Sequence, residues 1–174
     1  MALITEQDRI KEFENIKEFL EELEVAAEIL QKGGSLEESC LLLSMPTETE
    51  ELNGILPDDL HMATAYLTQT GDEEDQLTKY LTIYMPIQVD LTGADEGKVL
   101  KYVNDCNESF PFGTCFYGEN PLTGRMLVQV KWSIGGPVDE LLDEGVVCEA
   151  IFELGCLYDL LKEELLEMKP SFGL

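Results

Sequence analysis

Positively charged side chains are scarce in this chain of 174 residues. Eleven Lys and Arg residues stand against 36 Asp and Glu residues, which gives a formal net charge of −25 at pH 7. Affinity for phosphate backbones and for anionic lipid headgroups grows with the number of Lys and Arg contacts. The composition therefore argues against a nucleic-acid partner and against binding to a membrane surface.

Histidine is nearly absent, since His61 is the single copy. Zinc sites and hydrolytic sites built on imidazole usually use a second histidine or a Cys-x-x-Cys pair, and the sequence has neither. The five cysteines are odd in number and widely spaced, which is typical of reduced thiols in a cytoplasmic protein. We therefore expect a cytoplasmic protein with no catalytic residue, no metal site and no cofactor.

Long apolar runs are missing as well. No stretch reaches the length needed to span a bilayer, and the first residues form neither a basic leader nor a signal peptide. The hydrophobic fraction of 44% is nevertheless that of a globular protein, and a chain of this length can bury one core without disulfides. We expect a single domain over residues 1–174.

Three segments show the spacing of helices. Apolar residues at steps of three and four predict a first helix over residues 6–23, with Thr5 as its N-cap. A second helix is predicted to end near Ser109. The third, which begins at 139–140, has apolar residues on more than one side. Within it, Gly145 and Gly155 indicate close packing, a bend or a break, of which we favour close packing.

The strand signals surround the second helix. Runs rich in β-branched, aromatic and other apolar residues predict strands at 40–45, 62–69, 77–87, 114–117 and 126–132. Residues 24–31 fit both a helical continuation and a short strand, and both remain open. The expected fold is a single α+β domain with an antiparallel sheet of about five strands, helices on one face and the order α-β-β-β-α-β-β-α.

Two local sequences carry a family resemblance. The run YLTIYMPI at 80–87 is followed by VLKYVNDCN at 99–107, in which Leu100, Asn104 and Asn107 form a Leu…Asn…Asn pattern. Together with the strand pair and the long terminal helix, they resemble the YbjN-type family of bacterial sensory transduction regulators. The wider order of elements also resembles type III secretion chaperones. The likeness covers most of residues 60–168, and the acidic stretch 47–61 is longer than in either family.

The resemblance implies a small acidic α+β protein, often a homodimer, with a binding or regulatory role. Secretion chaperones hold an unfolded segment of their client along apolar patches. A terminal helix that is apolar on more than one side is consistent with dimerisation, because one side covers the sheet and another is left for a second copy. Alternatively, the segment 46–61 or the first helix covers that side within one chain.

We therefore expect a non-enzymatic protein-binding module, either a chaperone-like holder of a peptide or a regulatory adaptor. Its candidate contact residues for a partner or a second copy are Val147, Ile151 and Leu154, and an exposed sheet edge is a further candidate surface. The alternative is a metal-dependent enzyme that uses clustered carboxylates. Acidic groups at 72–75 and 90–97 would attract a hard cation, but neither has the ligand spacing of an EF-hand loop.

Overall fold

Three helices and a six-stranded sheet make up the part of the chain that the structure, a computed structural model, describes: residues 4–34, 36–44, 62–70, 78–110, 113–120 and 123–174. The elements follow the chain as α1 (Glu6–Glu22), β1 (Ala27–Leu30), β2 (Cys40–Ser44), β3 (Met62–Thr70), β4 (Thr78–Pro86), α2 (Glu96–Ser109), β5 (Thr114–Glu119), β6 (Met126–Pro137), α3 (Glu144–Met168) and the 3₁₀ turn η2 (Lys169–Phe172). The predicted α+β class and the order of elements are confirmed, with β1 as an additional strand. Two features of the sequence, the acidic segment 46–61 and the acidic group at 72–75, lie outside the described residues.

All strand pairs in the sheet are antiparallel, as predicted. The spatial order is β1-β2-β3-β4-β6-β5, so that β6 enters between β4 and β5. In this register Leu67 of β3 lies opposite Leu81 of β4, and Leu81 lies opposite Ile134 of β6. Because side chains alternate along a strand, these residues share one face of the sheet. The strand predicted at 77–87 is β4, and Pro86 is its last residue.

The segment left open at 24–31 contains strand β1. Helix α1 stops because Glu24 adopts a left-handed conformation with φ of 62°, and the N–H groups of Glu24 and Val25 donate to Glu21 and Leu20. This pair of hydrogen bonds is the usual closing motif of a helix, although glycine normally occupies the left-handed position. The chain then turns back as β1, which pairs with β2 from Ala27↔Leu43 to Leu30↔Cys40.

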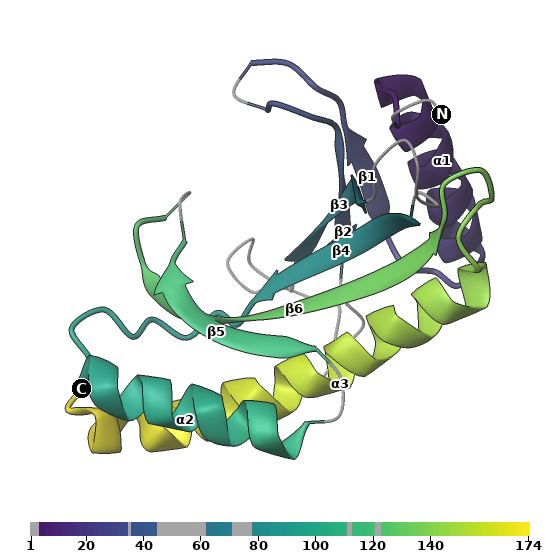
Figure 1. Ribbon diagram of the computed structural model, residues 1–174. Helices are drawn as coiled ribbons and strands as arrows, with labels where there is room; N and C mark the ends of the chain where they lie inside the picture. Colours follow the sequence, from purple (N-terminus) through teal and green to yellow (C-terminus); the bar gives the residue numbers. More distant parts are fainter. Residues whose placement is uncertain (1–3, 35, 45–61, 71–77, 111–112, 121–122) are drawn as a thin grey trace.

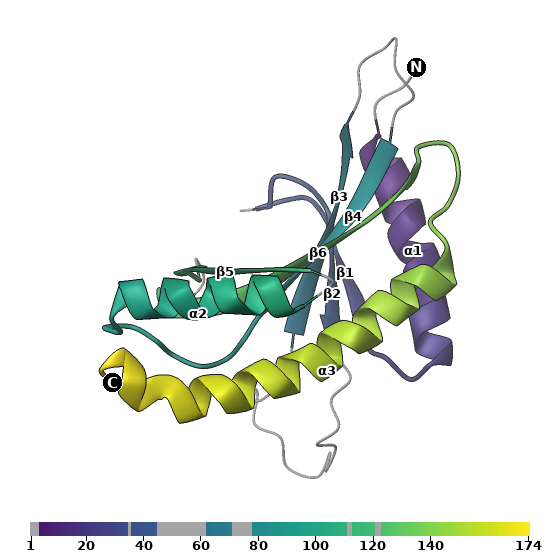
Figure 2. The ribbon, with the colours of Figure 1, turned by 60° about the horizontal axis from the view of Figure 1, so that its bottom comes forward.

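One hydrophobic core fills the space between the sheet and the helices. The three helices lie on the same side of a strongly curved sheet (Figures 1 and 2). Helix α1 contributes Phe13, Ile16 and Leu20 to this core, and the facing strands contribute alternate residues such as Leu43 and Ile83. The helices therefore bury one face of the sheet, as expected from the sequence.

The opposite face of the sheet carries a row of aromatic rings. Tyr66 of β3 and Tyr84 of β4 meet edge to face with their ring centres 6.0 Å apart, and Tyr84 meets Phe116 of β5 in the same way at 6.4 Å. All three side chains are half-buried. This row was not predicted, because the three rings come together only through the pairing of strands distant in sequence.

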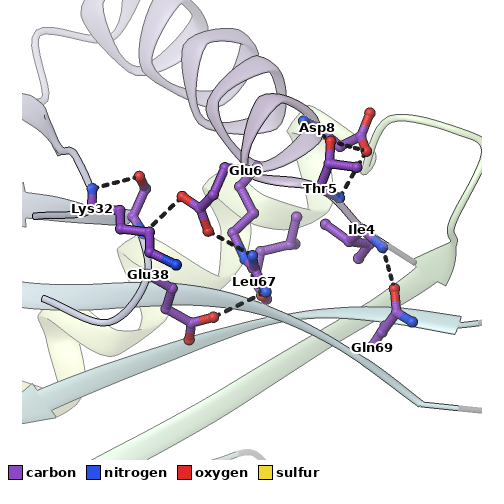
Figure 3. A network of polar contacts seen from close by, with 10 residues as sticks. Ile4, Thr5, Glu6, Asp8, Lys32, Glu38, Leu67 and Gln69 are labelled. Atoms are coloured by element: carbon purple, nitrogen blue, oxygen red, sulfur yellow. Dashed lines mark hydrogen bonds and ion pairs between the residues drawn. The ribbon is translucent and has the colours of Figure 1, made fainter. Parts of the chain in front are cut away.

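Polar contacts fix the start of α1 on the sheet (Figure 3). Thr5 is the N-cap, as predicted, and its hydroxyl accepts from the Asp8 N–H while the Asp8 carboxylate accepts from the Thr5 N–H. Arg9 reaches from the same turn to the Leu67 carbonyl of β3 at 3.1 Å and to the Glu38 carboxylate at 2.9 Å. These contacts connect the first helix to strand β3 and to the segment just before strand β2.

None of the described helices has both the length and the apolar character needed to cross a membrane.

Candidate functional site

Helix α3 is the longest element and has two different faces. It begins at the N-cap Asp143, whose side chain accepts from the Val146 N–H at 3.0 Å, and continues without a break to Met168. Gly145 and Gly155 therefore do not mark a break in the helix. Gly155 lies on the buried face of the helix.

The three predicted contact residues lie on the buried face of α3. Val147, Ile151 and Leu154 are 1%, 0% and 0% exposed in the folded chain, and they pack in the main core. A partner of the folded protein would not reach them, so this choice of surface residues was wrong. The reason is that helical spacing groups residues into faces, but it does not determine which of two apolar faces the sheet takes.

The outward face of α3 carries a second apolar row. Phe152, Cys156 and Leu160 follow each other at steps of four residues, which places them one above the other on a helix. Phe152 is 41% exposed, Leu160 is 44% exposed, and Cys156 is also exposed. We call these three residues the outer stripe. Their exposure shows that the sheet, α1 and α2 together leave part of the apolar surface of α3 uncovered in the described chain.

The outer stripe forms one wall of a surface hollow beside the end of α2. The hollow has a volume of about 290 Å³ and is lined by Phe110, Phe152, Glu153, Cys156, Leu157 and Leu160. Phe110 reaches this position because α2 ends there: Phe110 is extended, with φ of −92° and ψ of 127°, and it precedes Pro111 in the sequence. We call this feature the α2–α3 hollow.

Away from the hollow, helix α2 contacts both α3 and the turn η2 that follows it. The Tyr102 hydroxyl donates to Glu164 at 2.9 Å, and the Asp95 N–H donates to the Phe172 carbonyl at 2.8 Å. The Tyr102 and Phe172 rings also meet edge to face. Figure 2 shows the two helices beside each other, and the end of α2 lies next to the middle of α3. The walls of the hollow are therefore fixed by contacts elsewhere along the pair.

Acidic side chains surround the outer stripe. Glu149 lies one turn before Phe152, Glu163 lies one turn after Leu160, and Glu153 lines the hollow itself. Lys162 is the only basic residue between the ends of α3, and its ammonium lies 5.7 Å from the centre of the Tyr158 ring. The site thus combines an apolar floor with a negatively charged rim.

A second hollow, of about 180 Å³, lies beside a buried ion pair. Lys79 of β4 and Glu12 of α1 are 4% and 3% exposed, and the ammonium of Lys79 donates to Glu12 and to the Glu140 carbonyl. The other carboxylate oxygen of Glu12 accepts from the Leu142 N–H at 2.8 Å. Both charged groups are engaged by the protein itself, which identifies them as a structural connection among α1, β4 and the segment before α3.

The five cysteines are free thiols, and all of them lie within the described ranges. Cys106 of α2 and Cys115 of β5 are buried, and a hydrogen bond between the two thiols, together with burial, raises the pKa of Cys115. Burial also raises the pKa of Cys148. The hydrogen bond with Cys115 lowers the pKa of Cys106, but this thiol is buried in the core, where a substrate would not reach it.

The edge strand β5 is partly occupied by a side chain. The Asn107 amide accepts from the Cys115 N–H at 2.7 Å and donates to the Cys115 carbonyl at 3.0 Å. A neighbouring strand would form the same pair of hydrogen bonds. Of the three residues in the Leu…Asn…Asn pattern, Asn107 thus has a structural role, and it obstructs strand addition at this edge.

Of the acidic groups considered as cation sites, the structure describes the one at 90–97. Asp95 is the N-cap of α2, and Asp90 accepts from the Thr92 N–H at 2.9 Å. Both carboxylates therefore serve local structure. The acids at 72–75 and His61 lie outside the described residues. Within the residues that the structure does describe, no three metal-ligating side chains come together.

A scan against protein-family models and a search of curated proteins found no match to this chain. The resemblance to YbjN-type regulators and to secretion chaperones stays a prediction, based on the sequence segments that carry it and on the order of the elements.

Proposed function

We propose that this chain is a non-enzymatic protein-binding module of the cytoplasm, of the chaperone-like or adaptor kind, and that the α2–α3 hollow is its contact surface. The observation that carries the proposal is the outer stripe. Phe152 and Leu160 are exposed large apolar side chains, and they line one hollow together with Phe110 and Leu157. Apolar residues gathered in this way are typical of an interaction surface.

Three further features support binding over catalysis. The buried Glu12–Lys79 pair is engaged internally. Cys106, the thiol whose pKa is lowered by its hydrogen bond with Cys115, is buried in the core and therefore out of reach of a substrate. The hollow, in contrast, is lined by apolar side chains and a single carboxylate, from Glu153. Such a lining suits the burial of apolar side chains from another protein.

The test is site-specific photocrosslinking in cells that express the chain. A photoreactive amino acid at Leu160 should give a discrete crosslinked protein product, because a bound partner would cover this position. The matched control is the same amino acid at Leu23, which is 40% exposed at the end of α1. Adding Phe152→Gln should abolish the product at position 160.

The masses of the products have defined meanings. A product of twice the chain mass identifies a second copy, which is the predicted homodimer, and another discrete mass identifies a different protein. Either product supports the binding role of the hollow. Equal or absent crosslinking at positions 160 and 23 would overturn it.

A further inference from the structure

We infer that the α2–α3 hollow takes a basic amphipathic helix, a segment with apolar residues on one side and Lys or Arg beside them. This inference depends on the proposed function and specifies the partner of the same site. It follows from the length of the outer stripe, from the charge around it, and from the poor fit of a second copy.

The length of the outer stripe suits a short helix. Phe152 and Leu160 are eight residues apart, which corresponds to about 12 Å along α3 at the usual rise of an α-helix. A partner helix presents apolar residues over the same distance when they stand at positions i, i+4 and i+7 or i+8. Phe110 and Leu157 close the hollow beside the stripe and would contact the same apolar side.

The charge around the hollow selects a basic partner. Glu149, Glu153 and Glu163 are placed at both ends of the outer stripe and on its flank. Lys162, the one basic side chain in this part of α3, is directed to the Tyr158 ring. Lys and Arg residues beside the apolar anchors of a partner would meet these carboxylates, and the net charge of −25 would speed their encounter.

A second copy of the chain fits this surface poorly. A two-fold axis through Cys156 would place Phe152 opposite Leu160 of the other copy, which is apolar against apolar. The same axis would place Glu149 opposite Glu163 and Glu153 opposite Asp159, by the spacing of these residues from Cys156. Like charges placed opposite each other disfavour association. A second copy and a basic helix could therefore both make the apolar contact, but only the basic helix would also pair with the carboxylates around the hollow.

The test uses three synthetic helical peptides of equal length and the full chain. The first peptide has leucines at the anchor positions and lysines beside them, the second has glutamates in place of the lysines, and the third keeps the lysines but has glutamines at the anchors. Binding is read as protection of the exposed Cys156 thiol from alkylation. Only the first peptide should protect Cys156.

Variants of the chain distinguish binding of the peptide at the α2–α3 hollow from nonspecific attraction of a basic peptide to an acidic protein. Leu160→Gln leaves the net charge unchanged and should lower the affinity for the first peptide by roughly tenfold or more, since it removes apolar burial. Leu23→Gln is the matched control and should leave affinity unchanged. Removing the rim charges in Glu149→Gln/Glu153→Gln/Glu163→Gln should weaken binding by several-fold to tens-fold at low salt and reduce its salt dependence.

Several outcomes would overturn the inference. If Leu160→Gln and Leu23→Gln bind the basic peptide equally well, the attraction is electrostatic and not at the hollow. If the acidic peptide protects Cys156 as well as the basic one, the rim does not select the partner. If sedimentation shows a dimer that Leu160→Gln dissociates, a second copy occupies the hollow, and the proposed binding role of the surface survives without its basic partner.

Discussion

At the scale of single residues, Glu24 and Asn107 each have a specific structural role. Glu24 ends α1 in a left-handed conformation in which glycine is usual. Asn107 satisfies both backbone groups of Cys115 on the edge strand. Both side chains are exposed, and exposed residues are usually tolerant of substitution. For these two residues we predict a measurable change in stability.

Glu24→Gly should stabilise the protein by about 0.5–1 kcal/mol. The change relieves the left-handed strain and removes an acid from the negative end of α1, and these gains exceed the entropy cost of glycine. Urea unfolding measures the difference. The matched control is Glu22→Gly, which makes the same change in the last turn of the helix and should destabilise by a similar amount. A loss of stability in Glu24→Gly would contradict the strain argument.

Asn107→Ala should destabilise the protein by about 1–2 kcal/mol, because the Cys115 N–H and carbonyl lose their partner. Hydrogen exchange at the Cys115 amide should accelerate more than at the amides of β4. Asn104→Ala, one turn earlier on the exposed side of α2, serves as the control and should have little effect. Unchanged exchange at Cys115 in the Asn107 variant would show that another group protects this edge.

At the scale of elements, the Glu12–Lys79 pair connects segments that are far apart in the sequence. Glu12 lies on α1, Lys79 lies on β4, and the backbone groups of Glu140 and Leu142 complete the network before α3. Two charged side chains and two backbone groups thus form one hydrogen-bonded network that joins α1, β4 and the segment before α3. A buried pair of this kind is costly to break and much less costly to replace as a whole.

Glu12→Met and Lys79→Met should each destabilise by about 3–5 kcal/mol, because each leaves one buried charge without its partner. The double variant should be clearly more stable than the sum of the two single effects predicts, since it removes both charges. Denaturant unfolding of the three variants measures the coupling. Additive losses would mean that the two charges do not depend on each other.

The helices and most strands could be predicted from apolar spacing, but β1 and the outer stripe could not. Residues 24–31 contain no glycine at the point where the helix stops, so the usual signal for the turn at Glu24 is missing. In α3, apolar residues occur on more than one side of the helix. Spacing therefore could not show that Ile151 faces the sheet while Phe152 faces outward.

At the scale of the whole molecule, repulsion among the many carboxylates affects the stability of the fold. The net charge of −25 is distributed over a folded surface with few basic partners, and the described ion pairs other than Glu12–Lys79 are partly or fully exposed. Exposed pairs contribute little to stability. Repulsion among unpaired carboxylates should therefore lower the stability of the folded chain at low ionic strength.

Raising NaCl from about 0.01 M to about 0.1 M should raise the melting temperature, because the screening length falls from about 30 Å to about 10 Å. Thermal unfolding followed by circular dichroism measures the shift. A variant with Gln at the exposed positions Glu22 and Glu167 should show a smaller gain. A melting temperature that is constant or falls with salt would show that repulsion does not limit stability.

The position of β6 has a consequence for synthesis on the ribosome. Strand β4 pairs with β3 on one side, but its other side is covered only by β6, which is made after α2 and β5. A growing chain therefore displays an unpaired edge along β4 until β6 has left the ribosome. Such an edge is a template for aggregation, so the nascent protein passes through a vulnerable stage that the finished fold does not reveal.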